Sequence, residues 1–234
     1  MSTPILNRAR ITGVFYLLYF LTVMSAKLLV KELVVSGDAA ATANNLLAHE
    51  SLFRMSFAIN LIATALYISL TAFLYELLKA VNRSLALLAA LFSLAGCAVQ
   101  ALSYVFSLAP FLLWGGAPYL SVFNLGQLQA LALMLLKLRP QAEQIDLVFF
   151  GFFDLLIGCL ILKSTFLPRV LGALMAFAGL GWLIFLVPPL ANQLSHFILP
   201  LGFLAETLLM LWLLVKGVNI PRWQEQASAA EGRI

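Results

Sequence analysis

Residues 145–172 have the sequence IDLVFFGFFDLLIGCLILKSTFLPRVLG, an apolar stretch with one carboxylate, Asp154, near its middle. A membrane-spanning helix needs about 20 predominantly apolar residues, and the first part of this stretch approaches that length. A short turn carrying Lys163 and Arg169 follows, and a second apolar run begins directly after it. The stretch therefore predicts two membrane-spanning helices joined by a basic turn.

The composition of the whole chain agrees with this interpretation. Of its 234 residues, 63% are hydrophobic and 10% are charged, whereas soluble domains carry about 25% charged residues. So few charges cannot cover a soluble surface, which makes lipid the main solvent. The net charge of +4 does not indicate a nucleic-acid partner, because the basic residues gather at the ends of apolar runs.

The predicted fold is an all-α, polytopic transmembrane helix bundle with six spans plus an amphipathic or re-entrant outer helix. We expect residues 1–218 to form a single transmembrane domain and residues 219–234 a polar cytoplasmic tail. The first span continues beyond the small pair Ser25-Ala26, which favours a retained helix over a cleaved signal peptide. The six spans are expected at about residues 11–35, 53–80, 85–113, 144–162, 170–190 and 195–215.

Residues 119–138 form the ambiguous segment. They are mostly apolar, but polar residues such as Asn124 and Gln127 cluster in the first half. We interpret the segment as an amphipathic or re-entrant helix on the outer side; the competing interpretation is a seventh span. Before it, in the loop after the first span, Asp38 is expected to cap a short helix.

The positions of the basic residues decide between these topologies. With six spans, four basic pairs fall on one side of the membrane, whereas a seventh span at 119–138 would place the later two on the other side. The positive-inside rule makes the shared side cytoplasmic, and both termini then lie there, in a multi-pass protein of the cell inner (plasma) membrane. The pairs are Arg8/Arg10, Lys79/Arg83, Lys163/Arg169 and Lys216/Arg222.

Two acids lie about halfway along predicted spans, Asp154 in the fourth and Glu206 in the sixth. Ionisable groups inside a bilayer are costly and generally face the bundle interior with a partner. We expect the two acids to form the floor of an outward-facing polar cavity, with Lys27 or Arg54 as a counter-charge. The alternative is that these acids are paired and only fix helix packing. The other candidate ligand-binding residues are Asn60, Gln100, Tyr104 and His196.

No catalytic residue, metal site or cofactor is assigned. Two acids can act as an acid–base pair, and with His196 they could bind a metal, but a histidine at the membrane interface explains His196 more simply. The sequence has no HExxH, GxSxG, P-loop or GxGxxG motif. Cys97 and Cys159 lie in apolar runs without zinc-type spacing and are interpreted as packing residues.

Several short motifs, in order, resemble the domain of unknown function 4386 family of uncharacterised bacterial membrane proteins. The resemblance implies an integral membrane protein and supplies no catalytic residue. The motifs are Arg10-x-x-Gly13-x-x-Tyr16-Leu17, Gly37-Asp38, Thr42-Ala43-Asn44, Leu52-Phe53-Arg54, Phe149-Phe150-Gly151 through Gly158, Lys163-Ser164, Phe166-Leu167-Pro168-Arg169-x-Leu171-Gly172, Glu206, Leu211-Trp212-Leu213-Leu214 and Lys216-Gly217-Val218.

Three functions remain open at this point. The first is binding or moving a small ligand through the polar cavity lined by Asp154 and Glu206. The second is a structural or accessory role, and the third is an intramembrane enzyme acting on a lipid-like substrate. Membrane lipids are the expected partners, and a homo-oligomer is left open, because six spans without evident inverted repeats are few for a secondary transporter.

Overall fold

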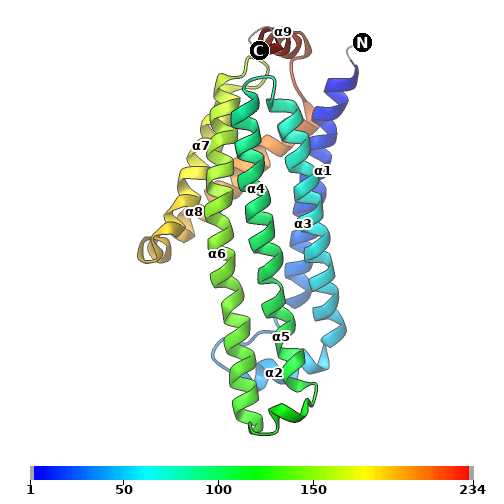
Figure 1. The fold of residues 1–234 in the computed structure, drawn as a ribbon, viewed down its shortest axis with the longest axis vertical. Helices are drawn as coiled ribbons and strands as arrows, with labels where there is room; N and C mark the ends of the chain where they lie inside the picture. The colour runs from blue at the N-terminus through cyan, green and yellow to red at the C-terminus, as the bar shows by residue number, and fades with distance from the viewer. Residues whose placement is uncertain (1–2, 232–234) are drawn as a thin grey trace. The chain divides into compact units, whose positions relative to one another are not determined.

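The computed structural model describes residues 3–231, which contain helices and no strand (Figure 1). The elements are α1 (Thr3–Val30), α2 (Ala39–Ala48), α3 (Glu50–Leu78), α4 (Arg83–Ser103), α5 (Val105–Trp114), η1 (Pro118–Leu120), α6 (Leu125–Lys163), α7 (Arg169–Trp182), η2 (Leu183–Leu186), α8 (Pro188–Val215) and α9 (Ile220–Glu231).

Six helical segments in the described part of the chain are long and apolar enough to cross a membrane, which confirms the predicted all-α transmembrane fold. They are Ile5–Val30, Glu50–Leu78, Arg83–Trp114, Leu125–Lys163, Arg169–Leu186 and Pro188–Val215.

The chain forms two compact units, and long helices contribute to both. Unit 1 comprises Met1–Leu18, Leu66–Cys97 and Ile145–Ile234, and unit 2 comprises Tyr19–Ala65 and Ala98–Gln144. Each unit is described by itself below.

The structure differs from the prediction at residues 119–144. The expected outer helix and fourth span are parts of one 39-residue helix, α6. At 1.5 Å per residue this helix is about 58 Å long, about twice the thickness of the hydrocarbon core. Pro140 lies inside it, and an ion pair of 2.7 Å from Arg139 to Glu143 stabilises the helix across the predicted break.

Other predicted boundaries also shift. The third span divides into α4 and α5 at Tyr104. Pro188, which the predicted bounds 170–190 place inside the fifth span, is the first residue of α8. Proline suits the first helical position because its missing N–H would have no helical partner there. The tail, predicted to be polar, forms α9, and its last residues, 232–234, lie outside the described part.

The short helix after Asp38 was predicted correctly. Asp38 has an extended backbone, and its Oδ1 accepts a hydrogen bond of 2.8 Å from the backbone N–H of Ala41, at the start of α2. This bond satisfies one of the free donors at a helix N-terminus.

Glycines set the close approach of α6 and α7 in unit 1. A Cβ on Gly172 would lie 2.7 Å from the backbone nitrogen of Leu162. A Cβ on Gly158 would overlap the backbone of Ala176, and a Cβ on Gly179 would overlap the backbone of Leu155. Small residues let helices approach closely in lipid, where apolar burial gives no drive to associate. Gly13 does the same for α1, where an added Cβ would lie 2.6 Å from the nitrogen of Leu214 in α8.

Unit 2 holds a small apolar core and several polar contacts between its helices. Leu33, Leu46, Phe53 and Leu136 form the core. The Ser56 hydroxyl donates a hydrogen bond of 3.0 Å to the carbonyl of Ala26, which joins α3 to α1.

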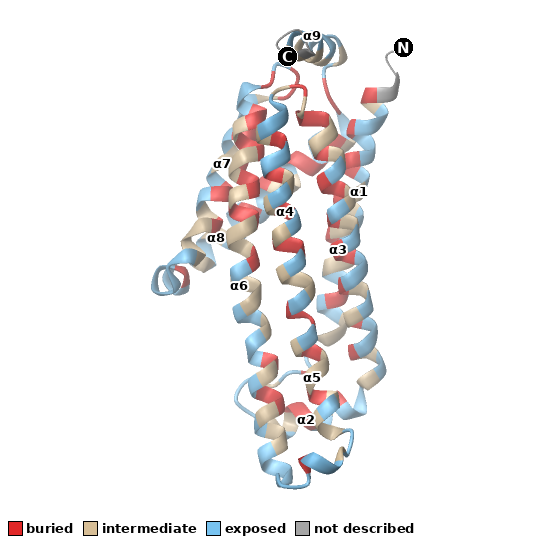
Figure 2. Ribbon diagram, in the orientation of Figure 1, coloured by how far each residue is buried: buried red, intermediate tan, exposed pale blue. Residues whose placement is uncertain are grey.

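Exposed residues run along the helices of both units (Figure 2), and many of them have large apolar side chains. Leu28, Leu102 and Phe177 are 71%, 68% and 62% exposed. Apolar faces of this kind are expected for helices that lie against lipid, because lipid tails are as apolar as the side chains.

Candidate functional site: a buried pair of acids

Asp154 of α6 is fully buried in unit 1. Its Oδ2 accepts a hydrogen bond of 3.0 Å from the indole Nε1 of Trp182, at the end of α7. Its Oδ1 has no hydrogen-bond partner among the described residues. A buried carboxyl oxygen without a partner is energetically costly, which distinguishes Asp154 from the ordinary packing residues around it.

Two glycines determine where the Trp182 ring lies. A Cβ on Gly151 of α6 would lie 3.0 Å from the Cβ of Trp182, and a Cβ on Gly202 of α8 would overlap the indole ring itself. The indole therefore lies where α6, α7 and α8 meet, and only glycine at position 202 leaves room for it.

Glu206 of α8 faces the same site. It follows Gly202 by one helical turn, so both are on one face of α8. The carboxyl groups of Glu206 and Asp154 lie within electrostatic reach of each other. The fully buried Tyr16 of α1 lies close to the Glu206 carboxyl group. Four helical segments thus each contribute one polar side chain: Tyr16, Asp154, Trp182 and Glu206.

No positive side chain balances this pair. Among the described residues, no Lys, Arg or His forms an ion pair with Asp154 or Glu206. Asp154 precedes Lys163, the end of α6, by nine residues, and Glu206 precedes Lys216 by ten. At 1.5 Å per residue both acids are about 14–15 Å from the basic ends of their helices, near the middle of a bilayer of about 30 Å.

The remaining candidate residues are not part of this acid pair. In unit 2, Arg54 forms an ion pair of 2.6 Å with Glu50 and lies over the ring of Phe111. Asn60 donates to the carbonyl of Ser56. The other candidates are placed as follows: Gln100 accepts a bond from Thr64, Tyr104 lies under the guanidinium of Arg139, Lys27 is exposed in α1, and His196 is exposed in α8.

Sequence reasoning missed Tyr16 and Trp182 as members of the site and gave no role to Asp146. Asp146 is buried within α6, two turns before Asp154, and it lies within electrostatic reach of Cys97. The eight-residue spacing of two acids on one apolar helix was a signal for Asp146. Nothing in the sequence alone points to the contacts of Tyr16 or Trp182.

Two pockets open at the basic end of unit 1, and neither is lined by Asp154 or Glu206. One, of about 620 Å³, lies between the α3–α4 turn and α9. The other, of about 390 Å³, lies by the α6–α7 turn and the α8–α9 connection. Asp154 is fully buried and Glu206 is half-buried, so the acid pair lies apart from both pockets, and the outward cavity stays a prediction.

The basic residues of unit 1 converge on one end. Arg8 lies 3.6 Å from Glu76, and Lys79 bonds the same carboxylate. The Trp223 indole of α9 donates a bond of 3.0 Å to the carbonyl of Leu77, and Arg222 contacts the carbonyl of Thr165. This convergence agrees with the six-span count derived from the charges.

The fold and composition define a multi-pass helical membrane protein. A family described as "Domain of unknown function (DUF4386)" matches residues 11–217, and the chain belongs to this family. It is also 28% identical, over 147 residues, to an uncharacterised protein of Archaeoglobus fulgidus; the match covers 62% of this chain and 72% of the relative. No solved structure matches the chain.

Proposed function

We propose that this membrane protein binds a small cationic ligand between Asp154 and Glu206. The observation that supports the proposal is the pairing of two acids from α6 and α8 without a positive side chain of the described chain beside them. Two carboxylates close together in apolar surroundings cannot both stay ionised without a compensating positive charge. That charge is either a shared proton or a bound cation.

The aromatic side chains at the site favour an organic cation. Trp182 and Tyr16 add an indole and a phenol to the two carboxyl groups. Aromatic faces attract cations electrostatically, and the attraction increases when both partners are desolvated. A small organic ammonium ion matches this combination of carboxylates and aromatic rings.

Because Asp154 is fully buried, ligand entry requires the helices around it to move, and α8 contains a suitable place for such a movement. Pro200 lies inside α8, six residues before Glu206. A proline within a helix removes one backbone hydrogen bond and favours a bend. A bend near Pro200 would move Gly202 away from the Trp182 ring and expose the carboxyl groups behind it.

A second candidate is the structural role, and the Trp182–Asp154 hydrogen bond favours it. This bond joins α7 to α6 at a site where glycines already hold the helices close together. In this alternative the acids share a proton permanently and only fix helix packing.

Calorimetric titration with methylammonium separates the two candidates. The purified full chain in detergent is titrated with methylammonium chloride, with sodium chloride as the reference. We expect saturable binding by the wild type and by the control Glu225→Gln, which changes an exposed acid on α9. Asp154→Asn and Glu206→Gln should each lose it. No saturable binding by the wild type, or equal binding by these variants, contradicts the proposal.

A further inference from the structure

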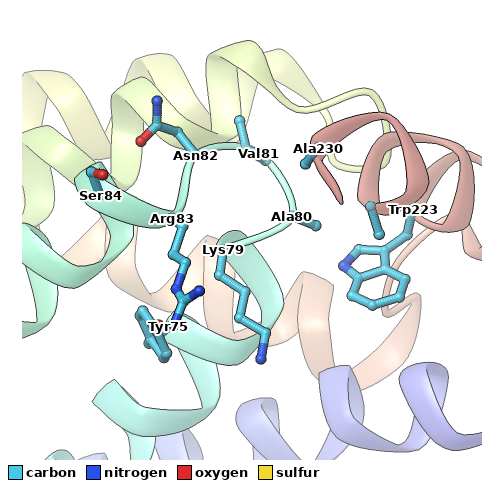
Figure 3. A pocket seen from close by; sticks show the side chains of 10 residues that line it. Tyr75, Lys79, Ala80, Val81, Asn82, Arg83, Ser84, Trp223 and Ala230 are labelled. Atoms are coloured by element: carbon cyan, nitrogen blue, oxygen red, sulfur yellow. The ribbon is translucent and has the colours of Figure 1, made fainter. Parts of the chain in front are cut away.

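The larger pocket at the basic end of unit 1 is the strongest feature that the acid pair does not explain. It has a volume of about 620 Å³ and lies between the α3–α4 turn and α9, as Figure 3 shows. Tyr75, Lys79, Arg83 and Ser84 form the side of the turn, and Trp223 and Ala227 form the side of α9.

Positive charge exceeds negative charge at this pocket. Glu76 accepts hydrogen bonds of 2.8 Å and 2.7 Å from Lys79 and also lies 3.6 Å from Arg8. One carboxylate is thus shared by two cations. Arg83 is exposed, and among the described residues no acid pairs with it. An anionic group that enters the pocket would find Lys79 and Arg83 only partly compensated.

The pocket lies at the level where lipid headgroups meet a membrane protein. Its turn connects the end of α3 at Leu78 to the start of α4 at Arg83, and both helices belong to spanning segments. Tyr75 and Trp223 add aromatic rings, which are enriched at membrane–water interfaces. Basic pockets between transmembrane helices on the cytoplasmic side are suited to phospholipid headgroups.

Contacts on the other side of α9 keep the pocket open. The side-chain oxygen of Gln226 accepts a hydrogen bond of 2.9 Å from the backbone N–H of Thr165, and its nitrogen donates one of 3.2 Å to the carbonyl of Lys163. The small side chains of Ala227 and Ala230 face the pocket. Gln226 thus fixes α9 to the α6–α7 turn and Trp223 fixes it to the carbonyl of Leu77 at the end of α3, and the space beside the α3–α4 turn stays unfilled.

We propose that this pocket binds the phosphate-bearing headgroup of an anionic phospholipid through Lys79 and Arg83. The phosphate lies between the ammonium and guanidinium groups, and the glycerol part lies against Tyr75 and Trp223. Arginine suits a phosphate because its planar guanidinium donates two parallel hydrogen bonds. The bound lipid connects α9 to the α3–α4 turn.

Native mass spectrometry of the full chain in detergent tests the proposal. The protein is titrated separately with dioleoylphosphatidylglycerol, dioleoylphosphatidylcholine and inorganic phosphate. We expect phosphatidylglycerol to bind more tightly than phosphatidylcholine. Each juxtamembrane cation contributes a factor of about five to affinity, so Lys79→Gln/Arg83→Gln should weaken phosphatidylglycerol binding about 30-fold.

The matched control removes two exposed cations from the other turn at the same end, in Lys163→Gln/Arg169→Gln. It has the same change in net charge and should keep most of the affinity. Arg83→Lys preserves the charge and should bind phosphatidylglycerol more tightly than Arg83→Gln. This comparison separates loss of the charge from a folding defect. Equal losses in both double variants, no preference for phosphatidylglycerol, or equally tight binding of inorganic phosphate alone would overturn the proposal.

Discussion

The indole of Trp182 donates a hydrogen bond of 3.0 Å to Asp154, and this bond connects the end of α7 to the middle of α6. It satisfies one of the two oxygens of this buried carboxyl group, which lies within electrostatic reach of Glu206. The bond thus contributes both to helix packing and to the proposed cation site.

Trp182→Phe removes the indole donor while keeping an aromatic ring. Because a buried acceptor then loses its partner, we expect a loss of about 1–3 kcal/mol in the free energy of unfolding. Trp212→Phe is the control, since Trp212 is 36% exposed and makes no side-chain hydrogen bond in the structure as described. Denaturant unfolding in detergent measures both changes, and equal losses would show that the indole donor is unimportant.

Gly158→Ala tests the close approach of α6 and α7. The added methyl group would overlap the backbone of Ala176, so we expect a cost of about 1–3 kcal/mol. In Gly126→Ala, in the same helix, the added Cβ would have one neighbouring atom, at 3.5 Å. This variant should leave the free energy of unfolding unchanged or raise it by up to about 1 kcal/mol through helix propensity. If the two variants melt at the same temperature, the helices do not approach as described.

Gln226→Ala tests how α9 is held. The substitution removes the bonds from Gln226 to Thr165 and Lys163, so we expect faster amide hydrogen exchange across Ile220–Glu231. Gln224→Ala is the control, because the exposed Gln224 makes no side-chain bond in the described part of the chain. Unchanged exchange in Gln226→Ala would mean that other contacts hold α9.

Cysteine labelling in intact cells tests the proposed orientation. In a background without Cys97 and Cys159, an impermeant thiol reagent added to the cells should label Ser121→Cys. Ser121 follows three spans, which places it on the outer side of the membrane if the N-terminus is cytoplasmic. Ser228→Cys, which follows six, should react only after permeabilisation. Labelling of Ser228→Cys in intact cells would contradict cytoplasmic termini.

The sequence allowed prediction of those features that depend on hydrophobicity and charge along the chain. These are the six apolar segments, the four basic pairs and the helix capped by Asp38. Each has a local physical cause: the cost of exposed apolar surface, the cost of moving cations across lipid, or the free donors of a helix end.

Features that depend on tertiary contacts escaped prediction. An interior proline costs a helix about 3 kcal/mol, whereas an i,i+4 pair such as Arg139–Glu143 returns only about 0.2–0.5 kcal/mol, so the continuity of α6 past Pro140 needs tertiary contacts. Arg139 makes such contacts with Ser107 and Tyr104. The order of the tail in α9 relies on bonds from Trp223 and Gln226 to turns far away in sequence. Asp154 and Glu206 were identified from their depth, whereas the aromatic residues beside them follow from helix packing.

The melting temperature of Glu206→Gln, measured with and without methylammonium, tests the cation site most directly. Glutamine keeps the shape of the side chain but removes one of the two like charges. Functional sites are commonly destabilised for the sake of activity. We therefore expect the ligand-free variant to have a free energy of unfolding about 0.5–2 kcal/mol above that of the wild type, and hence a higher melting temperature. We also expect it to lose the stabilisation by methylammonium that the wild type shows. A less stable variant that still responds to methylammonium would contradict the account.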